Sequence, residues 1–309
     1  MSNLFKVLEI IIPIFTIISL GIYAKKNNKL SEEACKGLQQ FVMTFCLPCV
    51  LFNSCLTGDL GMETVTAMVL IVPFVFLSSL WAFRFGRKKY PYHNMPLIFS
   101  AKEIGMLGIP LFMILFGAEN AYRMGVLDVA QGIVAIPVIT ILSANTGVNP
   151  TPGYVAKKVF QSPLLLMSLL GMAMNLTGAM GFLNEIGVGG IITESTGLIG
   201  QPVSAVILFC VGYNFSLEKE NRKRVFEICG LALFIFGVVC AAIQGILCLV
   251  PFVDMETRWV ILLYCALPGS FLSVSLGKTK EESTVAAGVC SILTILCLVV
   301  FCIMAVVVI

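Results

Sequence analysis

The chain has little charge, a single histidine and no long polar segment, and each shortage excludes a class of protein. Only 12% of the 309 residues are charged, 58% are hydrophobic, and the mean hydropathy is +0.98. These values lie far outside the range of soluble globular proteins. The sequence contains no Walker A, G-x-S-x-G or H-E-x-x-H motif, which argues against ATP hydrolysis and against an intramembrane enzyme. His93 has no partner ligands in the sequence, so we expect neither a metal nor a cofactor.

Long apolar runs fill the chain instead. A helix needs about 20 apolar residues to cross the hydrocarbon core of a bilayer. Ten such runs are present, and the connections between them are too short for a soluble domain; they cover 4–24, 34–56, 64–83, 95–117, 122–144, 158–178, 191–213, 227–250, 257–277 and 283–308. The sequence therefore predicts an all-α integral membrane protein with ten transmembrane helices.

The basic residues divide unevenly between alternate connections, which predicts the orientation of the chain. The even-numbered connections carry only Arg123 and Arg258, whereas the odd-numbered ones carry Lys25, Lys26, Lys29, Arg84, Arg87, Lys88, Lys89, Lys157, Lys158, Lys219, Arg222, Lys223, Arg224, Lys278 and Lys280. By the positive-inside rule the odd connections are cytoplasmic. We expect a multi-pass protein of the cytoplasmic membrane with both termini on the extracellular or periplasmic side.

Ten spans divide into two sets of five, and an odd number per set gives the second set the opposite orientation. Pro48 and Pro202 are separated by about 155 residues, and so are Pro110 and Pro268. We therefore predict two inverted repeats, 1–144 and 158–309, joined by a cytoplasmic linker at 145–157. Inverted repeats with interrupted helices at matching positions are typical of transporters.

The fourth and ninth predicted spans each carry proline and glycine near their centres. A proline inside a helix removes one hydrogen bond and clashes with the preceding turn. If both helices break at the prolines and cross there, two half-helix N-termini meet and favour an anion, most simply a carboxylate. The alternative is that each proline only kinks a packed helix. The candidate substrate-binding residues at this crossing are Gly108, Ile109, Pro110, Pro268, Gly269 and Ser270.

Two ionisable residues precede Pro110 within the same apolar run. Charged groups inside a bilayer are costly and are by default functional. Glu103 lies about two helical turns before Pro110, on the same helix face. Its carboxylate could bind a coupled proton or cation, or could pair with Lys102, and the ammonium of Lys102 could instead extend toward the cytoplasmic interface.

Four further polar residues are weaker candidates for the same site. Asp128 and Gln131 lie on one face of the fifth predicted span, where they either line a cavity or form a buried hydrogen-bonded pair. Asn53 lies near the extracellular end of the second span, and Ser273 lies about one turn after Pro268. We include all four among the candidate substrate-binding residues.

Four segments resemble the auxin efflux carrier family of membrane transporters, in its prokaryotic form. They are LPCVLFNSCL (47–56), IGMLGIPLFMILFG (104–117), LFCVGYNFSLEK (208–219) and ALPGSFLSVSLGKTKEES (266–283). The family includes plant auxin exporters and bacterial carriers of malate or malonate. The resemblance implies two inverted five-helix repeats, a site where broken spans 4 and 9 cross, and a homodimer. Bile-acid-type sodium symporters share that general architecture.

The chain departs from the plant pattern at the proposed site. Glu103 stands where the plant carriers usually have asparagine, and Gly269 stands where they tend to have glutamine. We expect an elevator-like secondary transporter of small organic anions, such as malate, malonate or auxin-like acids. The alternative is a symporter or antiporter coupled to Na⁺ or H⁺, with Glu103 and Asp128 as the cation ligands. Neither expectation involves a nucleic acid.

Overall fold

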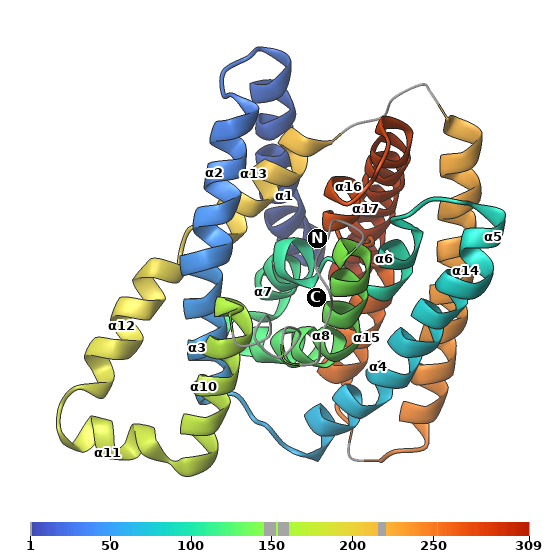
Figure 1. Cartoon of the computed structure of the whole chain (residues 1–309). Helices are drawn as coiled ribbons and strands as arrows, with labels where there is room; N and C mark the ends of the chain where they lie inside the picture. Colours follow the sequence, from blue (N-terminus) through green and yellow to red (C-terminus); the bar gives the residue numbers. More distant parts are fainter. Residues whose placement is uncertain (1, 145–152, 154–160, 216–220, 252, 309) are drawn as a thin grey trace.

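A computed structural model describes the whole chain except residues 1, 145–152, 154–160, 216–220, 252 and 309 (Figure 1). Its described residues form helices and no strand. The helices are α1 (Ser2–Lys26), α2 (Glu32–Phe41), η1 (Val42–Cys46), α3 (Leu47–Thr57), α4 (Met62–Trp81), η2 (Ala82–Gly86), α5 (Arg87–Lys89), α6 (Met95–Ser100), η3 (Ile104–Gly108), α7 (Ile109–Phe116), η4 (Ala118–Asn120), α8 (Ala121–Ala144), α10 (Pro163–Thr177), α11 (Ala179–Glu185), α12 (Gly189–Gly200), α13 (Val203–Asn214), α14 (Arg222–Cys248), α15 (Met255–Ala266), α16 (Leu272–Ser275) and α17 (Lys280–Val308).

Within the described ranges, seven helical runs are long and apolar enough to cross a membrane. An eighth is obtained if α10 and α11, which are bent by 79° at Gly178, count as one span. The predicted spans 95–117 and 257–277 do not appear among them, because each is interrupted by a few residues that are not helical. The protein is therefore an all-helical, multi-pass membrane protein, and its two interrupted spans are the feature that shapes the site.

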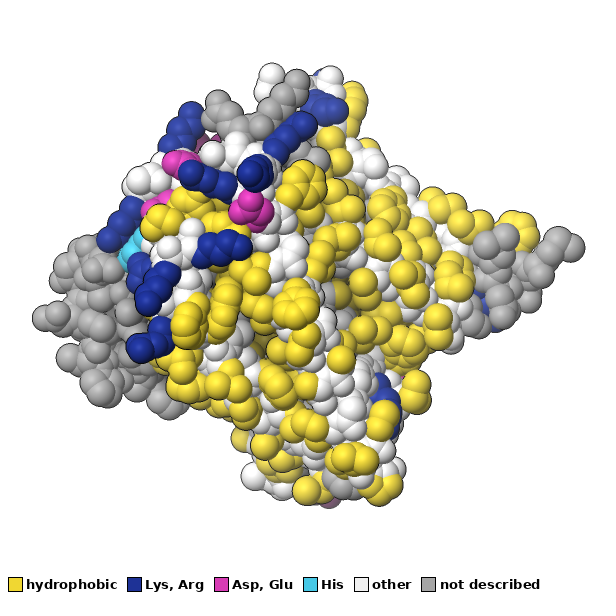
Figure 2. Space-filling model, turned by 90° about the vertical axis from the view of Figure 1, so that its right-hand side faces the viewer, with side chains coloured by type: hydrophobic (Ala, Val, Ile, Leu, Met, Phe, Trp, Pro, Cys, Tyr) yellow, Lys and Arg dark blue, Asp and Glu magenta, His cyan; other side chains and the backbone are white. Residues whose placement is uncertain are grey.

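The basic connections lie at one end of the molecule. The turn between α1 and α2 and the start of α14 are at the top of Figure 1, and the segment around α5 lies at the right in the upper half, whereas the connections after α3, α10 and α14 are at the bottom. Most of the Lys and Arg side chains visible in Figure 2 gather toward the same end, above a broad hydrophobic surface. The predicted linker 145–157, with Lys157 and neighbouring Lys158, falls outside the described residues except for Gly153.

Three helices begin with a local capping signal that the sequence carries. The Ser31 hydroxyl accepts a hydrogen bond from the Ala34 amide at 3.1 Å, and acidic residues follow in the first turn of α2. Asp254 accepts from the amide of Thr257 at 2.7 Å at the start of α15. The side chain of Ser162 caps α10, with a proline in the next position. Each cap satisfies an amide that would otherwise lack a partner at a helix start.

Two prolines of the first half follow a wide helical turn instead of a break. The π-helical turn η1 precedes Pro48, and the π-helical turn η3 precedes Pro110. A π turn shifts the hydrogen bonds by one residue, so the carbonyl that the proline cannot bond is displaced and the helix continues. The run Glu32–Thr57 is accordingly one long helix despite Pro48.

The helices pack closely where both partners are small. A Cβ atom added to Gly21 of α1 would lie 2.0 Å from the carbonyl oxygen of Phe209, and one added to Gly212 of α13 would lie 2.0 Å from that of Ile18. Glycine is therefore required on both sides of the α1–α13 contact, as at many close helix crossings in membranes. The largest core cluster joins side chains from both halves of the chain, including Leu47, Phe112, Ile261 and Phe301.

Candidate functional site at two interrupted helices

Two helices that are far apart in sequence are interrupted at the same place in the molecule. The first interruption, residues 101–103, lies between α6 and η3, and the second, residues 267–271, lies between α15 and α16. The backbone at Ala101 is extended, with φ −134° and ψ 128°. The sequence places the first break at Pro110, and this is wrong. Residues 104–116 form one helical run, which continues through Pro110 because the π turn η3 precedes this proline.

The two interruptions are hydrogen-bonded to each other. Lys102 and Gly269 form an isolated antiparallel bridge. The Glu103 amide donates to the Pro268 carbonyl at 3.0 Å, and the Ser270 amide donates to the Ala101 carbonyl at 2.9 Å. Non-helical backbone at membrane depth is tolerated only where such groups are satisfied inside the protein. Each interruption therefore supplies the hydrogen bonds that the other lacks.

Glycine is required at position 269 by the closeness of the two segments. A Cβ atom there would lie 2.6 Å from the carbonyl oxygen of Ile98. Glutamine, which the plant carriers tend to have at this position, carries a Cβ atom and would not fit so close to the backbone of Ile98. The neighbouring Pro268 is buried and lies within the interruption, as the sequence predicts.

Gln131 of α8 completes the backbone pairing of Lys102 from the other side. Its Oε1 accepts from the Lys102 amide at 2.7 Å, and its Nε2 donates to the Lys102 carbonyl at 3.0 Å. The hydroxyl of Tyr264 donates to the same Oε1 at 3.1 Å. The side-chain amide thus takes the place of a neighbouring strand. In this structure Gln131 positions the interruption, with its hydrogen-bonding capacity largely used by protein groups.

The side chains of Lys102 and Glu103 point in opposite directions, because successive residues of an extended segment face opposite sides. Glu103 is only 8% exposed, and its Oε2 accepts from the Phe271 amide at 2.7 Å. The Ser270 hydroxyl and the Met106 amide also lie near this carboxylate. Glu103 therefore holds a carboxylate of the protein near amides of both continuing helical segments, whereas the sequence predicts an anion at half-helix N-termini that begin at Pro110 and Pro268.

Lys102 is 5% exposed and reaches toward α14 and α15. Its Nζ donates to the carbonyl of Leu267 at 2.7 Å and lies 3.3 Å from the centroid of the Phe236 ring. Neither Glu103 nor any other acidic side chain in the described part of the chain lies within ion-pair distance of it. The ion pair between Lys102 and Glu103 that the sequence allowed is absent from this part of the structure, and the ammonium does not extend to the interface.

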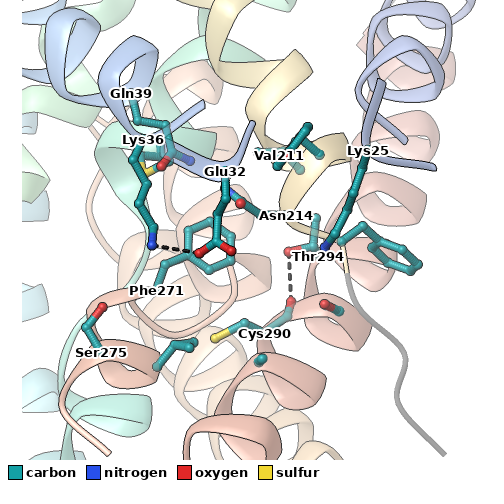
Figure 3. Close-up of a pocket in the computed structure, with 16 residues that line it drawn as sticks. Lys25, Glu32, Lys36, Gln39, Val211, Asn214, Phe271, Ser275, Cys290 and Thr294 are labelled. Carbon is teal, nitrogen blue, oxygen red and sulfur yellow. Dashed lines mark hydrogen bonds and ion pairs between the residues drawn. The ribbon is translucent and has the colours of Figure 1, made fainter. Parts of the chain in front are cut away.

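A cavity of about 400 Å³ lies next to the two interrupted helices and is lined by residues adjacent to Glu103, although not by Glu103 itself (Figure 3). Met106 and Phe271, which flank the Glu103 carboxylate in the two interrupted helices, line one wall. The opposite wall comes from α1, α2 and α13 and carries Lys25, Lys36 and Glu32, with Lys36 and Glu32 paired at 2.6 Å. Two cations and one anion at the rim favour negatively charged solutes.

The other predicted residues lie at different distances from this cavity. Gly108 packs against the Leu267 side chain, and Ile109 and Pro110 are buried behind it. Ser273 is fully buried, with its hydroxyl 3.9 Å from the Cys290 thiol. Asp128 is partly exposed and makes no hydrogen bond with a described residue. The structure therefore joins Lys102, Glu103, Gln131 and the two interruptions into one cluster.

Asn53 does not belong to this cluster. Its side chain bonds Thr193 and Thr196 of α12, accepting from the Thr196 hydroxyl at 2.6 Å and donating to the Thr193 carbonyl at 3.2 Å. It lines a separate cavity of about 360 Å³ between α3 and α12. We interpret Asn53 as a helix-packing residue in this conformation, since both ends of its amide are engaged.

Several residues that shape the site were not foreseen from the sequence. Tyr264 and Phe236 are aromatic residues within apolar runs, which are common in membrane helices, so nothing marked them. Asn94 donates to the carbonyls of Ser273 and Glu282, at 2.8 and 3.2 Å, and ties α6 to the end of α16. Asn94 is a buried polar residue beside an apolar run, and that was the one available signal.

An ionic cluster lies at the end of the molecule opposite the basic connections. Arg123 at the start of α8 pairs with Asp254 at 2.7 Å and with Glu256 at 3.1 Å. Burial raises the pKa of Asp254, but the amide and hydroxyl of Thr257 and the Arg123 guanidinium outweigh it and hold that pKa below its usual range.

Among the described residues no group of three or more His, Cys, Asp or Glu side chains is arranged to hold a metal.

Comparison with known proteins agrees with a transport role. A family model described as "Membrane transport protein" matches residues 6–149. The chain is 21% identical over 256 residues to the uncharacterized transporter YfdV of Escherichia coli strain K12, covering 74% of this chain and 78% of YfdV. The YfdV proteins of Escherichia coli O157:H7 and Shigella flexneri match to the same extent.

Proposed function

We propose that this chain, which resembles the auxin efflux carrier family and whose residues 6–149 match a family model of membrane transport proteins, is a secondary active transporter of small organic anions. Its substrates would be carboxylates such as malate, malonate or auxin-like acids, carried across the cytoplasmic membrane. The observation that carries this proposal is the cavity whose inner wall is built from two interrupted, mutually bonded helices. Discontinuous helices at a cavity are where transporters hold their substrates.

Helix contacts support the two inverted five-span repeats. If α1, α2–α3, α4, α6–α7 and α8 form the first repeat, then α10–α11, α12–α13, α14, α15–α16 and α17 form the second. The contact of α1 with α13 then corresponds to that of α10 with α3. Likewise α4 contacts α6 and α8, while α14 contacts α15 and α17. A twofold relation of this kind is expected of an inverted repeat, and it gives ten spans in total.

The same contacts support an elevator-like mechanism. We define a support unit (α1–α3 and α10–α13) and a crossing unit (α4–α8 and α14–α17). The cavity lies between them, because α1, α2 and α13 line one wall and η3, α16 and α17 line the other. We propose that the crossing unit carries the bound anion past the support unit. Alternating access of a fixed site by rigid-body movement is common in repeat-built transporters.

Glu103 would control access of the anion to the site. In this conformation its carboxylate occupies the amides that an external carboxylate would use. An ionised Glu103, with Asp128 nearby, repels an anionic substrate, whereas a protonated Glu103 does not. We therefore expect carboxylate binding to weaken as the pH rises, and we expect a proton to be carried with the substrate.

The test is a thermal-shift series on the purified protein in detergent. Malate, malonate and indole-3-acetate would be added as N-methylglucamine salts, with N-methylglucamine chloride as the ionic-strength control, at two pH values. The proposal predicts that at least one carboxylate raises the Tm, and that proteoliposomes exchange that acid when it is radiolabelled. The proposed substrate class fails if no carboxylate changes the Tm and none is exchanged.

Glu103→Gln is the decisive variant for the role of this residue. It keeps the shape of the side chain but removes the charge, so we expect a folded protein whose carboxylate binding no longer depends on pH and whose transport is abolished or uncoupled. Glu33→Gln, an exposed acid on α2, is the matched control and should behave like the wild type. Wild-type transport and pH dependence in Glu103→Gln would refute the coupling role.

A second candidate, a carrier whose main cargo is a cation, is favoured by one observation. Glu103 is a buried acid at the meeting point of the interruptions, and Asp128 is a second acid near it. Sodium-dependent thermal stabilisation without any effect of carboxylates would favour this candidate.

The proposed assembly and orientation follow from the family and from the basic loops. We propose a homodimer with both termini outside the cytoplasm. Cross-linking in native membranes would test the dimer, and cysteine-accessibility labelling near Ser2 would test the orientation.

A further inference from the structure

Lys102 is a buried cation of the crossing unit, and the groups around its Nζ are those that would bind a free cation. Nζ donates to the carbonyl of Leu267, which directly follows the last residue of α15. The C-terminal end of a helix carries partial negative charge. The ring of Phe236 presents its face at 3.3 Å, and the face of an aromatic ring attracts cations.

No carboxylate takes part in this arrangement within the described part of the chain. The ion pairs between described residues are those of Lys36 with Glu32, of Arg123 with Asp254 and Glu256, and of Arg224 with Glu281. Glu103 faces the other way, toward Phe271. Carbonyls of unwound backbone and half-helix C-terminal ends are the ligands that transporters use for a coupling cation such as Na⁺. The ammonium of Lys102, which is covalently part of the chain, binds a carbonyl of this kind at Leu267.

We propose that the ammonium of Lys102 is a built-in substitute for a coupling cation, so that this carrier needs no Na⁺. This inference rests on the proposed function in taking the chain to be a transporter, and it is independent of which anion is carried. A covalently attached donor at the interruption keeps the Leu267 carbonyl satisfied while the crossing unit moves. A free cation would have to bind and leave in each cycle to do the same.

A cavity beside Lys102 makes the inference testable by chemical replacement. About 370 Å³ of space lies among α14, α15 and α17, lined by Lys102, Phe236, Cys240, Cys265 and Leu267, with mostly apolar walls. Lys102→Ala would add to this cavity the space that the lysine side chain now occupies beyond its Cβ atom. The vacated position suits a small alkylammonium ion that reaches it through the cavity.

The experiment compares the full-length wild type with Lys102→Ala and Lys102→Met in detergent and in proteoliposomes. Thermal melts would be recorded in sodium chloride, n-propylammonium chloride and choline chloride at equal concentration, with 1-propanol as the uncharged control. We expect sodium and choline to act alike on the wild type. We expect both variants to have a lower Tm in choline, and transport to fall by about tenfold or more. Sodium or n-propylammonium, but neither choline nor 1-propanol, should restore Lys102→Ala.

Three results would overturn the inference. The first is a Tm of the wild type that rises in sodium but not in choline, since a filled site would not bind sodium. The second is a Lys102→Met variant equal to the wild type in Tm and transport, which would show that only the side-chain volume matters. The third is a folded Lys102→Ala variant that no cation restores. If Lys102→Ala does not fold, the inference is still tested by the Tm of the wild type in sodium against choline and by the Tm and transport of Lys102→Met.

Failure of the proposed substrate class gives a different pattern. In that case no carboxylate changes the Tm of the wild type, yet the cation response of Lys102→Ala remains. The two hypotheses are therefore separated by the ligand that is varied, carboxylates for the substrate and cations for the role of Lys102.

Discussion

Replacing Gln131 should destabilise the site by an amount that the structure allows us to estimate. Gln131→Met keeps the length and volume of the side chain but removes its amide. The Lys102 amide then loses the partner it has at 2.7 Å, and the Lys102 carbonyl loses the bond at 3.0 Å but keeps the Ile104 amide at 2.9 Å. A buried backbone group left without a partner costs about 1–3 kcal/mol and the loss of one further hydrogen bond about 0.5–1.5 kcal/mol, so the free energy of unfolding should fall by about 1.5–4.5 kcal/mol.

Tyr264 provides an internal check on that estimate. Tyr264→Phe removes only the hydroxyl that donates to Gln131 at 3.1 Å, and Gln131 still binds Lys102. We expect a loss of about 0.5–1.5 kcal/mol, typical of one hydrogen bond. In the Gln131→Met background the hydroxyl has already lost its partner, so Tyr264→Phe should then cost almost nothing. The two substitutions should therefore be strongly non-additive.

Unfolding of the purified protein by sodium dodecyl sulfate in mixed micelles measures these free energies, and a double-mutant cycle isolates the coupling. Gln39→Met, at a partly exposed glutamine that lines the main cavity, is the matched control and should change stability by less than about 0.5 kcal/mol. A Gln131→Met variant as stable as the wild type, or additive effects of the two substitutions, would refute the assignment of Gln131 as the backbone partner of Lys102.

Other substitutions test other parts of the structure. Gly212→Val should prevent the close contact of α13 with α1 and lower the yield and Tm of folded protein. Gly245→Ala, whose added Cβ meets no atom within 4 Å, should instead raise the free energy of unfolding by about 0.5–1 kcal/mol. Equal effects of the two substitutions would contradict the close packing of α1 against α13. Pro268→Ala should weaken carboxylate-dependent thermal stabilisation more than Pro110→Ala, because only Pro268 lies in an interruption; the reverse order would count against the site. The pKa of Asp254 is lowered in the folded protein, so its stabilising effect is present above the ordinary pKa of aspartate and is lost as the pH falls through the lower folded value. Melts in acid should therefore show a shallower fall of Tm for Asp254→Asn than for the wild type, and parallel curves would exclude this role.

The sequence identifies the apolar runs and the basic connections well, because both depend on composition over many residues. Prolines are a less reliable guide. Pro110 lies inside the continuous helical run 104–116, directly after a π turn, and the break occurs instead at 101–103. That break exists because Gln131 and the second interruption supply its hydrogen bonds. Such long-range partners leave no mark in the local pattern around residue 101.

The opposite directions of Lys102 and Glu103 have the same origin. On a helix, adjacent side chains diverge by about 100°, so Lys102 and Glu103 could have lain on the same side of the helix. The extended backbone separates them fully and places each against a different helix end. Two adjacent letters in the sequence thus become two separate charged positions, and only the backbone conformation decides this.

The single bridge between Lys102 and Gly269 also constrains how the protein can be made. While the first half is inserted alone, the extended backbone at 101–103 has no partner from the second half, and hydrocarbon cannot satisfy it. The first half must then remain a continuous helix, stay close to the insertion machinery, or be shielded by another protein until the second half arrives. The interrupted pair can therefore be completed only after residues 267–271 have been made, and a chain truncated before residue 267 should be recognised and degraded as unfinished.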